Sequence, residues 1–140
     1  MIEINYLAVL AAGIVSMIIG AIWYGPLFGK VWPALSSMTP EGMATAKAKG
    51  MAKPYAINFV GALVMAYVFA HVLAAFGNAL GTSGWVAGLQ GGFFMWLGFV
   101  APLLLGSILW ENKTFKLYAI NAGYYLVLLI VNGIIIACWQ

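Results

Sequence analysis

The chain has 140 residues, a formal net charge of +3 and a mean hydropathy of +1.03. Hydrophobic residues make up 65% of it and charged residues only 6%, whereas about a quarter of a soluble domain is charged. So few charges cannot solvate the surface of a globule, and the composition predicts an integral membrane protein in lipid. The net charge is too small and dispersed for nucleic-acid binding, and the single Cys138 allows no intramolecular disulfide.

Four apolar segments are each long enough to cross a bilayer, which takes about 20 helical residues. They cover residues 4–24, 54–76, 85–110 and 117–139. Small and polar residues recur in them at helical spacings, and the short alternating segments of a β-barrel are absent. Pro102 inside the third span predicts a kink that shapes the packing, with a transporter hinge as the alternative. We expect an all-α integral membrane protein, a single transmembrane domain over residues 1–140 with four helices in a bundle.

The first span ends at an aromatic pair followed by Gly25-Pro26, which ends or bends a helix. Trp and Tyr are enriched at membrane–water interfaces, and Lys side chains reach the lipid phosphates from there. We therefore expect the chain to leave the membrane here and turn along its surface. The expected lipid-interface anchors are Trp23, Tyr24, Lys30, Trp32, Lys47, Lys49 and Lys53.

The connection of residues 25–53 contains one predicted short amphipathic surface helix, over residues 40–49. The Thr-Pro-Glu start at residues 39–41 supplies a cap, a first-position proline and an acid at the positive end of the helix dipole. Its lysines would hold it to anionic lipid. Gly42 and Gly50 leave a mobile loop open as the alternative.

All six lysines fall between spans one and two or between spans three and four. The connection of residues 77–84 carries no charge, and neither terminal segment carries a lysine. The positive-inside rule assigns lysine-bearing connections to the cytoplasm. We therefore expect a multi-pass protein with both termini on the outer side of the membrane.

Small residues recur at four-residue intervals, as they do where membrane helices pack closely. The positions are Ala12, Ser16 and Gly20 in the first span, Ala62, Ala66 and Ala70 in the second, and Gly88 and Gly92 in the third. These stripes can build the bundle, a homo-oligomer or both. Three stripes exceed what a minimal four-helix bundle needs, which favours a homodimer or a larger assembly.

Polar side chains within the spans form two expected layers. His71, Gln90 and Asn132 lie toward the outer ends, and Asn58 and Asn121 toward the inner ends. An ionisable residue inside a membrane is a functional candidate by default, which singles out His71. The favoured alternative is an ordinary interhelical hydrogen-bond cluster, because polar groups buried in a membrane need partners in any case.

No catalytic residue, metal site or cofactor is predicted. One histidine without a buried carboxylate or thiol does not make a metal site, and the glycines form no phosphate-binding loop. All three glutamates, Glu3, Glu41 and Glu111, lie at span boundaries, which counts against a proton-driven exporter. The expected partner is the lipid bilayer, and an enzyme is disfavoured.

Four stretches of the sequence resemble the DUF1761 family. They are GAIWYGPLFGKVW at residues 20–32, MTPEGM at 38–43, VMAYVFAHVLAAF at 64–76 and the segment of residues 94–139. The Trp-Tyr-x-Pro turn and the Trp-Glu-Asn connection are not generic membrane features. The resemblance implies a small four-helix protein of the bacterial inner membrane, with its termini periplasmic by the charge rule. It carries no established activity and no site residues.

Two functions stay open from the sequence alone. The first is a self-associating membrane protein that binds or transports a small or lipid-like molecule. The second is an accessory or scaffold subunit without transport or catalysis. A continuous cavity lined by His71, Gln90, Asn121 and Asn132 would favour the first, and a packed interior with an exposed apolar groove would favour the second.

Overall fold

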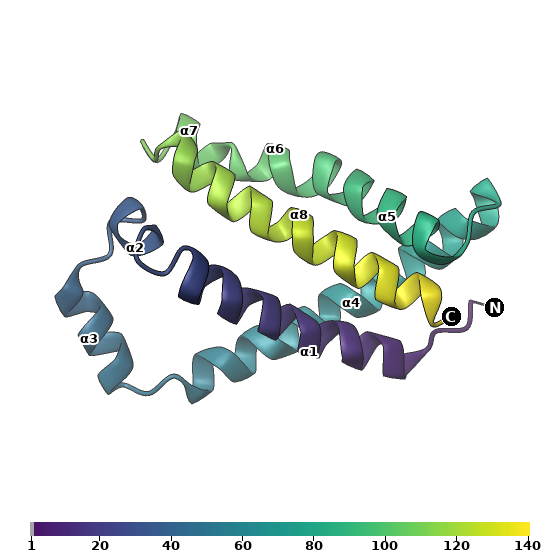
Figure 1. Ribbon diagram of the computed structural model, residues 1–140, viewed down its shortest axis with the longest axis horizontal. Coiled ribbons are helices and arrows are strands. Elements are labelled where there is room, and N and C mark those ends of the chain that lie inside the picture. Colours follow the sequence, from purple (N-terminus) through teal and green to yellow (C-terminus); the bar gives the residue numbers. More distant parts are fainter. Residues whose placement is uncertain (1) are drawn as a thin grey trace.

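The computed structural model describes residues 2–140, and that part of the chain folds into helices without strands. Four helical spans are long and apolar enough to cross a membrane: Tyr6–Leu27, Ala52–Leu80, Gly84–Leu109 and Phe115–Cys138. They lie close to the four predicted spans, although the second is longer at both ends. The predicted all-α bundle is confirmed (Figure 1).

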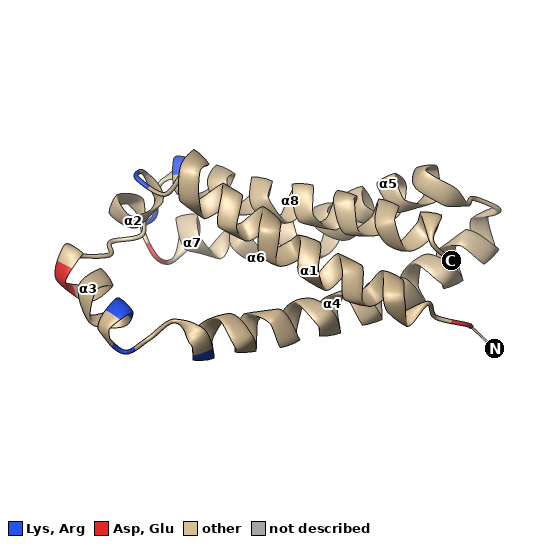
Figure 2. Ribbon diagram, turned by 60° about the horizontal axis from the view of Figure 1, so that its bottom comes forward, with Lys and Arg blue, Asp and Glu red and all other residues tan. Residues whose placement is uncertain are grey.

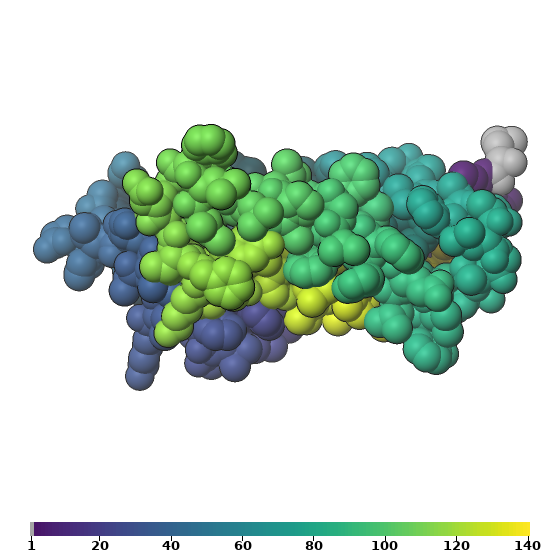
Figure 3. Space-filling view, turned by 90° about the horizontal axis from the view of Figure 1, so that it is seen from above, coloured from purple at the N-terminus to yellow at the C-terminus, as the bar shows by residue number. Residues whose placement is uncertain are grey.

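The spans are assembled from helices with the following bounds. The first is α1 (Tyr6–Ile22) and the π-helical η1 (Trp23–Leu27), the second is α4 (Ala52–Leu80), and the fourth is α8 (Phe115–Cys138). The third is divided into α5 (Gly84–Met95), the π-helical η2 (Trp96–Val100), α6 (Ala101–Leu104) and α7 (Gly106–Leu109). Two short helices, α2 (Trp32–Leu35) and α3 (Pro40–Ala48), lie in the first connection. Figure 3 shows α8 in yellow between the third span in green and the first in purple.

Helix ends follow local capping chemistry. The side chains of Asn5, Thr39 and Thr114 accept hydrogen bonds from backbone N–H groups in the first turns of α1, α3 and α8. The helix predicted over residues 40–49 is thereby confirmed as α3, with the predicted cap. α4 ends at Gly81, whose φ of +65° is a conformation that glycine adopts without strain.

Both predicted helix irregularities occur at prolines, in the form of π-helical turns. Pro26 lies inside η1, and Pro102 lies two residues beyond the end of η2, in the first turn of α6. Proline has no N–H to donate to the carbonyl four residues before it, so the local turn widens. The chain then leaves η1 through Gly29, where an added Cβ would overlap the carbonyl oxygen of Gly25. The irregularity of the third span extends over several short elements instead of lying at Pro102 alone.

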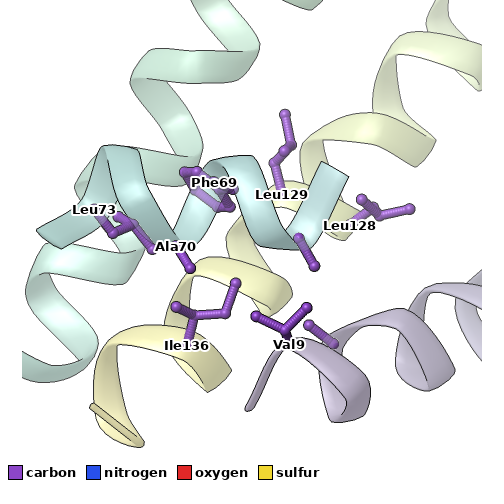
Figure 4. Close-up of a cluster of buried hydrophobic side chains, with 9 residues drawn as sticks. Val9, Phe69, Ala70, Leu73, Leu128, Leu129 and Ile136 are labelled. Atoms are coloured by element: carbon purple, nitrogen blue, oxygen red, sulfur yellow. The ribbon is translucent and has the colours of Figure 1, made fainter. Parts of the chain in front are cut away.

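The core lies where α1, α4 and α8 meet (Figure 4). Its buried apolar side chains are Val9, Ala12, Ala66, Phe69, Ala70, Leu73, Leu128, Leu129 and Ile136. α5 and α8 approach most closely at Gly88 and Gly133, where an added Cβ on either glycine would overlap the other's carbonyl oxygen. A Cβ on Gly92 would lie 2.6 Å from the carbonyl oxygen of Leu129. Glycine therefore lets the two backbones touch.

The small residues of the predicted stripes pack mostly inside the chain. Those that are buried are Ala12, Ser16, Ala66, Ala70, Gly88 and Gly92, while Gly20 and Ala62 are half-buried. Gly20 faces the ring of Tyr124, whose hydroxyl would lie 3.3 Å from an added Cβ. Because the bundle itself uses these positions, the stripes alone no longer point to an oligomer.

Charges are divided between the two ends of the bundle (Figure 2). The lysine-bearing connections form one end, which we call the lysine end. Both chain termini and Glu3 lie at the other, which we call the terminus end. This separation is the one that the charge pattern predicts.

Candidate functional site

Two tryptophan side chains hold α8 from opposite neighbours near its lysine end. The indole N–H of Trp23 in η1 donates to the carbonyl of Ile120 at 3.0 Å, and that of Trp96 in η2 donates to the carbonyl of Ala122 at 2.7 Å. Each tryptophan is the first residue of a π-helical turn. The two irregular turns therefore also position the hydrogen bonds that join the first and third spans to α8.

Asn121 lies between these two bonded carbonyls and collects two further donors. Its Oδ1 accepts from the hydroxyl of Tyr24 at 2.8 Å and from the indole N–H of Trp32 at 3.1 Å. Trp23, Tyr24 and Trp32, predicted as lipid-interface anchors, are half-buried and direct these polar atoms toward α8. These hydrogen bonds to α8 could not be predicted from the sequence, because Ile120 and Asn121 lie about a hundred positions further along the chain. Lys30, Lys47, Lys49 and Lys53, the other predicted anchors, are exposed.

Asn132 is buried at the α1–α8 contact, with 1% of its surface exposed. Its Nδ2 donates to the Ser16 hydroxyl at 2.8 Å, and that hydroxyl donates to the carbonyl of Ala12 at 2.7 Å. Its Oδ1 is buried and has no hydrogen-bond partner in residues 2–140. Ser16, predicted only as a packing position, is thus also the polar partner of Asn132.

The other three predicted polar residues are held separately. His71 Nδ1 lies 3.0 Å from the carbonyl of Tyr67 on its own helix, and since a carbonyl only accepts, this nitrogen carries the proton. Asn58 is exposed and donates to the sulfur of Met17 at 3.4 Å. Gln90 is exposed on α5. Within the described residues, the five predicted side chains therefore do not form one hydrogen-bonded cluster.

An apolar groove lies between the second half of α4 and α5, with a volume of about 40 Å³. Its apolar lining includes Leu73, Phe76, Leu80, Ala87, Phe94 and Met95. Gln90 and Thr82 supply its polar side chains. Gln90 is thus the one member of the predicted polar set that lines this groove.

The groove adjoins an open chamber of about 570 Å³ at the terminus end. Its polar lining side chains are Glu3, Asn78, Thr82, Ser83 and Gln140. Groove and chamber share the walls formed by Leu73, Gly77, Thr82 and Ala87. The apolar groove along α4 and α5 therefore borders a polar space directly.

The connection between α4 and α5 shapes the chamber. The backbone N–H of Thr82 donates to the carbonyl of Gly77 at 3.2 Å, and an added Cβ on Gly77 would lie 3.0 Å from the carbonyl oxygen of Thr82. From the sequence, the only feature predicted for the connection of residues 77–84 was that it carries no charge. Its uncharged polar residues between two apolar spans were the available signal for a polar chamber.

The groove and the chamber offer two different kinds of contact. In the part of the chain that the structure describes, no three His, Cys, Asp or Glu side chains lie close enough together to hold a metal ion. The groove offers apolar contact, and the chamber offers amide, hydroxyl and carboxylate groups. Such a pair of surfaces matches a molecule with an apolar tail and a polar head.

Comparison with known proteins gives one match. A family model described as "Protein of unknown function (DUF1761)" matches residues 7–137. No curated protein and no solved structure matches the chain. The matched region includes almost all of the four spans, and with them the groove between α4 and α5.

Proposed function

We propose a function from the site itself, because the chain belongs to the DUF1761 family and that family's description assigns no activity. The protein binds an amphiphilic, lipid-like molecule between α4 and α5, with the head of the molecule in the polar chamber and part of its tail in the groove. The observation that carries this proposal is the wall that the apolar groove and the polar chamber share.

The head of the ligand supplies most of the selectivity. Lipid tails are as apolar as the side chains of a membrane helix, so burying a tail in the groove gains little over leaving it in the bilayer. Asn78, Thr82 and Gln140 can form hydrogen bonds with a polar head, and the number and direction of such bonds differ from one head group to another. We therefore place recognition in the chamber and orientation in the groove.

Binding without passage through the bundle is the form of this function that the geometry supports. Of the four residues expected to line a transport cavity, only Gln90 lines the groove. Asn132 is buried in the α1–α8 contact, and the touching backbones of Gly88 and Gly133 close the α5–α8 contact. A binding or accessory role therefore replaces transport in our proposal. We further propose that the protein lies in the bacterial inner membrane with its lysine end in the cytoplasm.

Neighbouring alanines of α4 give a matched test. Ala74 lines the chamber, whereas Ala75 is exposed and lies outside both chamber and groove. Ala74→Phe should place an aromatic ring in the chamber, and Ala75→Phe adds the same ring elsewhere. Native mass spectrometry of protein extracted with its surrounding lipid should show a retained amphiphile in the natural protein and in Ala75→Phe, and about tenfold weaker retention in Ala74→Phe.

Two results would contradict the proposal. One is the absence of any retained amphiphile from the natural protein, and the other is equal retention by the two variants. Gln90→Leu tests the groove separately from the chamber, because it removes a polar side chain from the groove without adding bulk. It should alter which amphiphiles are retained while leaving the extracted protein folded.

A further inference from the structure

The first half of α4 is exposed in a way that the other half is not. Residues 52–58 make about two turns of helix, and every one of them is exposed, although the Asn58 side chain still reaches Met17 of α1. The cause is the crossing with α1 at Gly13, where Leu63 and Phe59 fill the place of a side chain. Beyond that crossing α4 diverges from the bundle toward α3 (Figure 2).

Lipid alone is a poor cover for this stretch because it carries an amide. Asn58 lies five residues beyond Lys53, about 7.5 Å further into the helix. Its Nδ2 reaches only the sulfur of Met17, a weak acceptor, and its Oδ1 accepts no hydrogen bond within the described residues. A carboxamide both donates and accepts, so two copies related by a two-fold axis can satisfy each other.

The charges of α3 also favour a second copy of this chain as the partner of the exposed surface. This helix is exposed along its length except for the half-buried Met43, and it runs across the long axis of the bundle (Figure 1). Glu41 stands in its first turn and Lys47 in its last, about 9 Å apart along the helix. A two-fold axis parallel to the bundle sets two copies of α3 antiparallel, which brings each Glu41 toward the partner's Lys47. An anionic lipid surface would attract the lysine and repel the glutamate.

We propose that α3 and residues 52–65 of α4 form a two-fold interface with a second copy of this chain, with Asn58 beside the axis. This interface leaves the chamber free, because the chamber lies at the opposite end of α4. The proposal therefore stands or falls separately from amphiphile binding.

Cysteine cross-linking in native membranes tests the interface with a matched pair of positions. Ile57 and Leu109 are 62% and 63% exposed, and each lies four residues from a lysine at the lysine end. In a Cys138→Ser background, Ile57→Cys should form a cross-linked dimer with a bifunctional maleimide, and Leu109→Cys should not. Equal cross-linking at the two positions, or none at Ile57→Cys, would overturn the proposal.

A charge exchange tests the orientation of the two copies. Glu41→Lys should reduce the dimer cross-linked through Ile57→Cys, and adding Lys47→Glu to the same chain should restore it. Asn58→Leu should also reduce cross-linking, with the far-ultraviolet circular dichroism of the chain unchanged. If neither Glu41→Lys nor Asn58→Leu reduces the cross-linked dimer, this arrangement of α3 and α4 is excluded.

Discussion

Asn121 and Asn132 lie on one face of α8, yet their amides are used differently. Asn121 accepts two hydrogen bonds through one oxygen, while Asn132 donates one bond and keeps its oxygen buried without a partner in residues 2–140. Helical spacing places the two side chains on one face, because eleven residues make about three turns. The spacing does not identify the partners of the two amides. Tyr24 and Ser16 come from the first span, where they were predicted as a lipid-interface anchor and a helix-packing position.

Ser16 and Asn132 should show strong coupling. Ser16→Ala removes the acceptor of a buried amide, and we expect it to lower the free energy of unfolding by about 1–2 kcal/mol. Asn132→Leu removes both the amide and its unpaired oxygen, so the double variant should regain most of that loss. Reversible unfolding in mixed micelles measures the cycle. A double variant less stable than Ser16→Ala would show that the pair is not coupled in this way.

Trp96 and Trp110 provide a comparison between a bonded and an unbonded indole. Trp96 donates to the carbonyl of Ala122, whereas Trp110 is 84% exposed. Trp96→Phe should cost about 1 kcal/mol of stability through the lost hydrogen bond, in addition to any loss of packing, and Trp110→Phe should cost less. Thermal unfolding in one detergent compares them. Equal losses would argue that the indole of Trp96 contributes no specific bond.

At the scale of elements, the spans were predictable and their irregularities only partly so. Apolar length locates a helix in a membrane, because the bilayer leaves the backbone no other partner within a span. The second span is longer than predicted because the Gly-Asn-Ala-Leu stretch at residues 77–80, typical of a connection, continues α4 to its cap at Gly81. Proline marked both irregular sites, but it did not indicate that the turns are π-helical or that the first tryptophan of each turn bonds to α8.

The contact of α5 with α8 gives a prediction for glycine. Gly88→Ala places a Cβ against the backbone at Gly133, whereas nothing lies within 4 Å of a Cβ added at Gly98. The first change should lower stability by about 1–3 kcal/mol through overpacking, and Gly98→Ala should be close to neutral. Measuring the two variants by the same unfolding assay tests the contact, and a stable Gly88→Ala protein would contradict it.

For the whole molecule, the fold was more predictable than the candidate site. Composition and span length leave few arrangements for four apolar helices. The site depends instead on residues distant in the sequence, since Glu3, Thr82 and Gln140 line one chamber. Among the predicted polar residues only Gln90 reached the groove, because periodicity assigns a residue to a helix face but not to a neighbour.

Labelling from one side of the membrane tests the arrangement on which both proposals rest. Thr45 at the lysine end and Ser83 at the terminus end are exposed, and each can carry the single cysteine of a Cys138→Ser protein. With a membrane-impermeant maleimide that reaches the periplasm of intact cells, we predict labelling of Ser83→Cys, and labelling of Thr45→Cys only after the membrane is opened. Labelling of both in intact cells, or of Thr45→Cys alone, would contradict a bundle that spans the membrane with its lysine end in the cytoplasm.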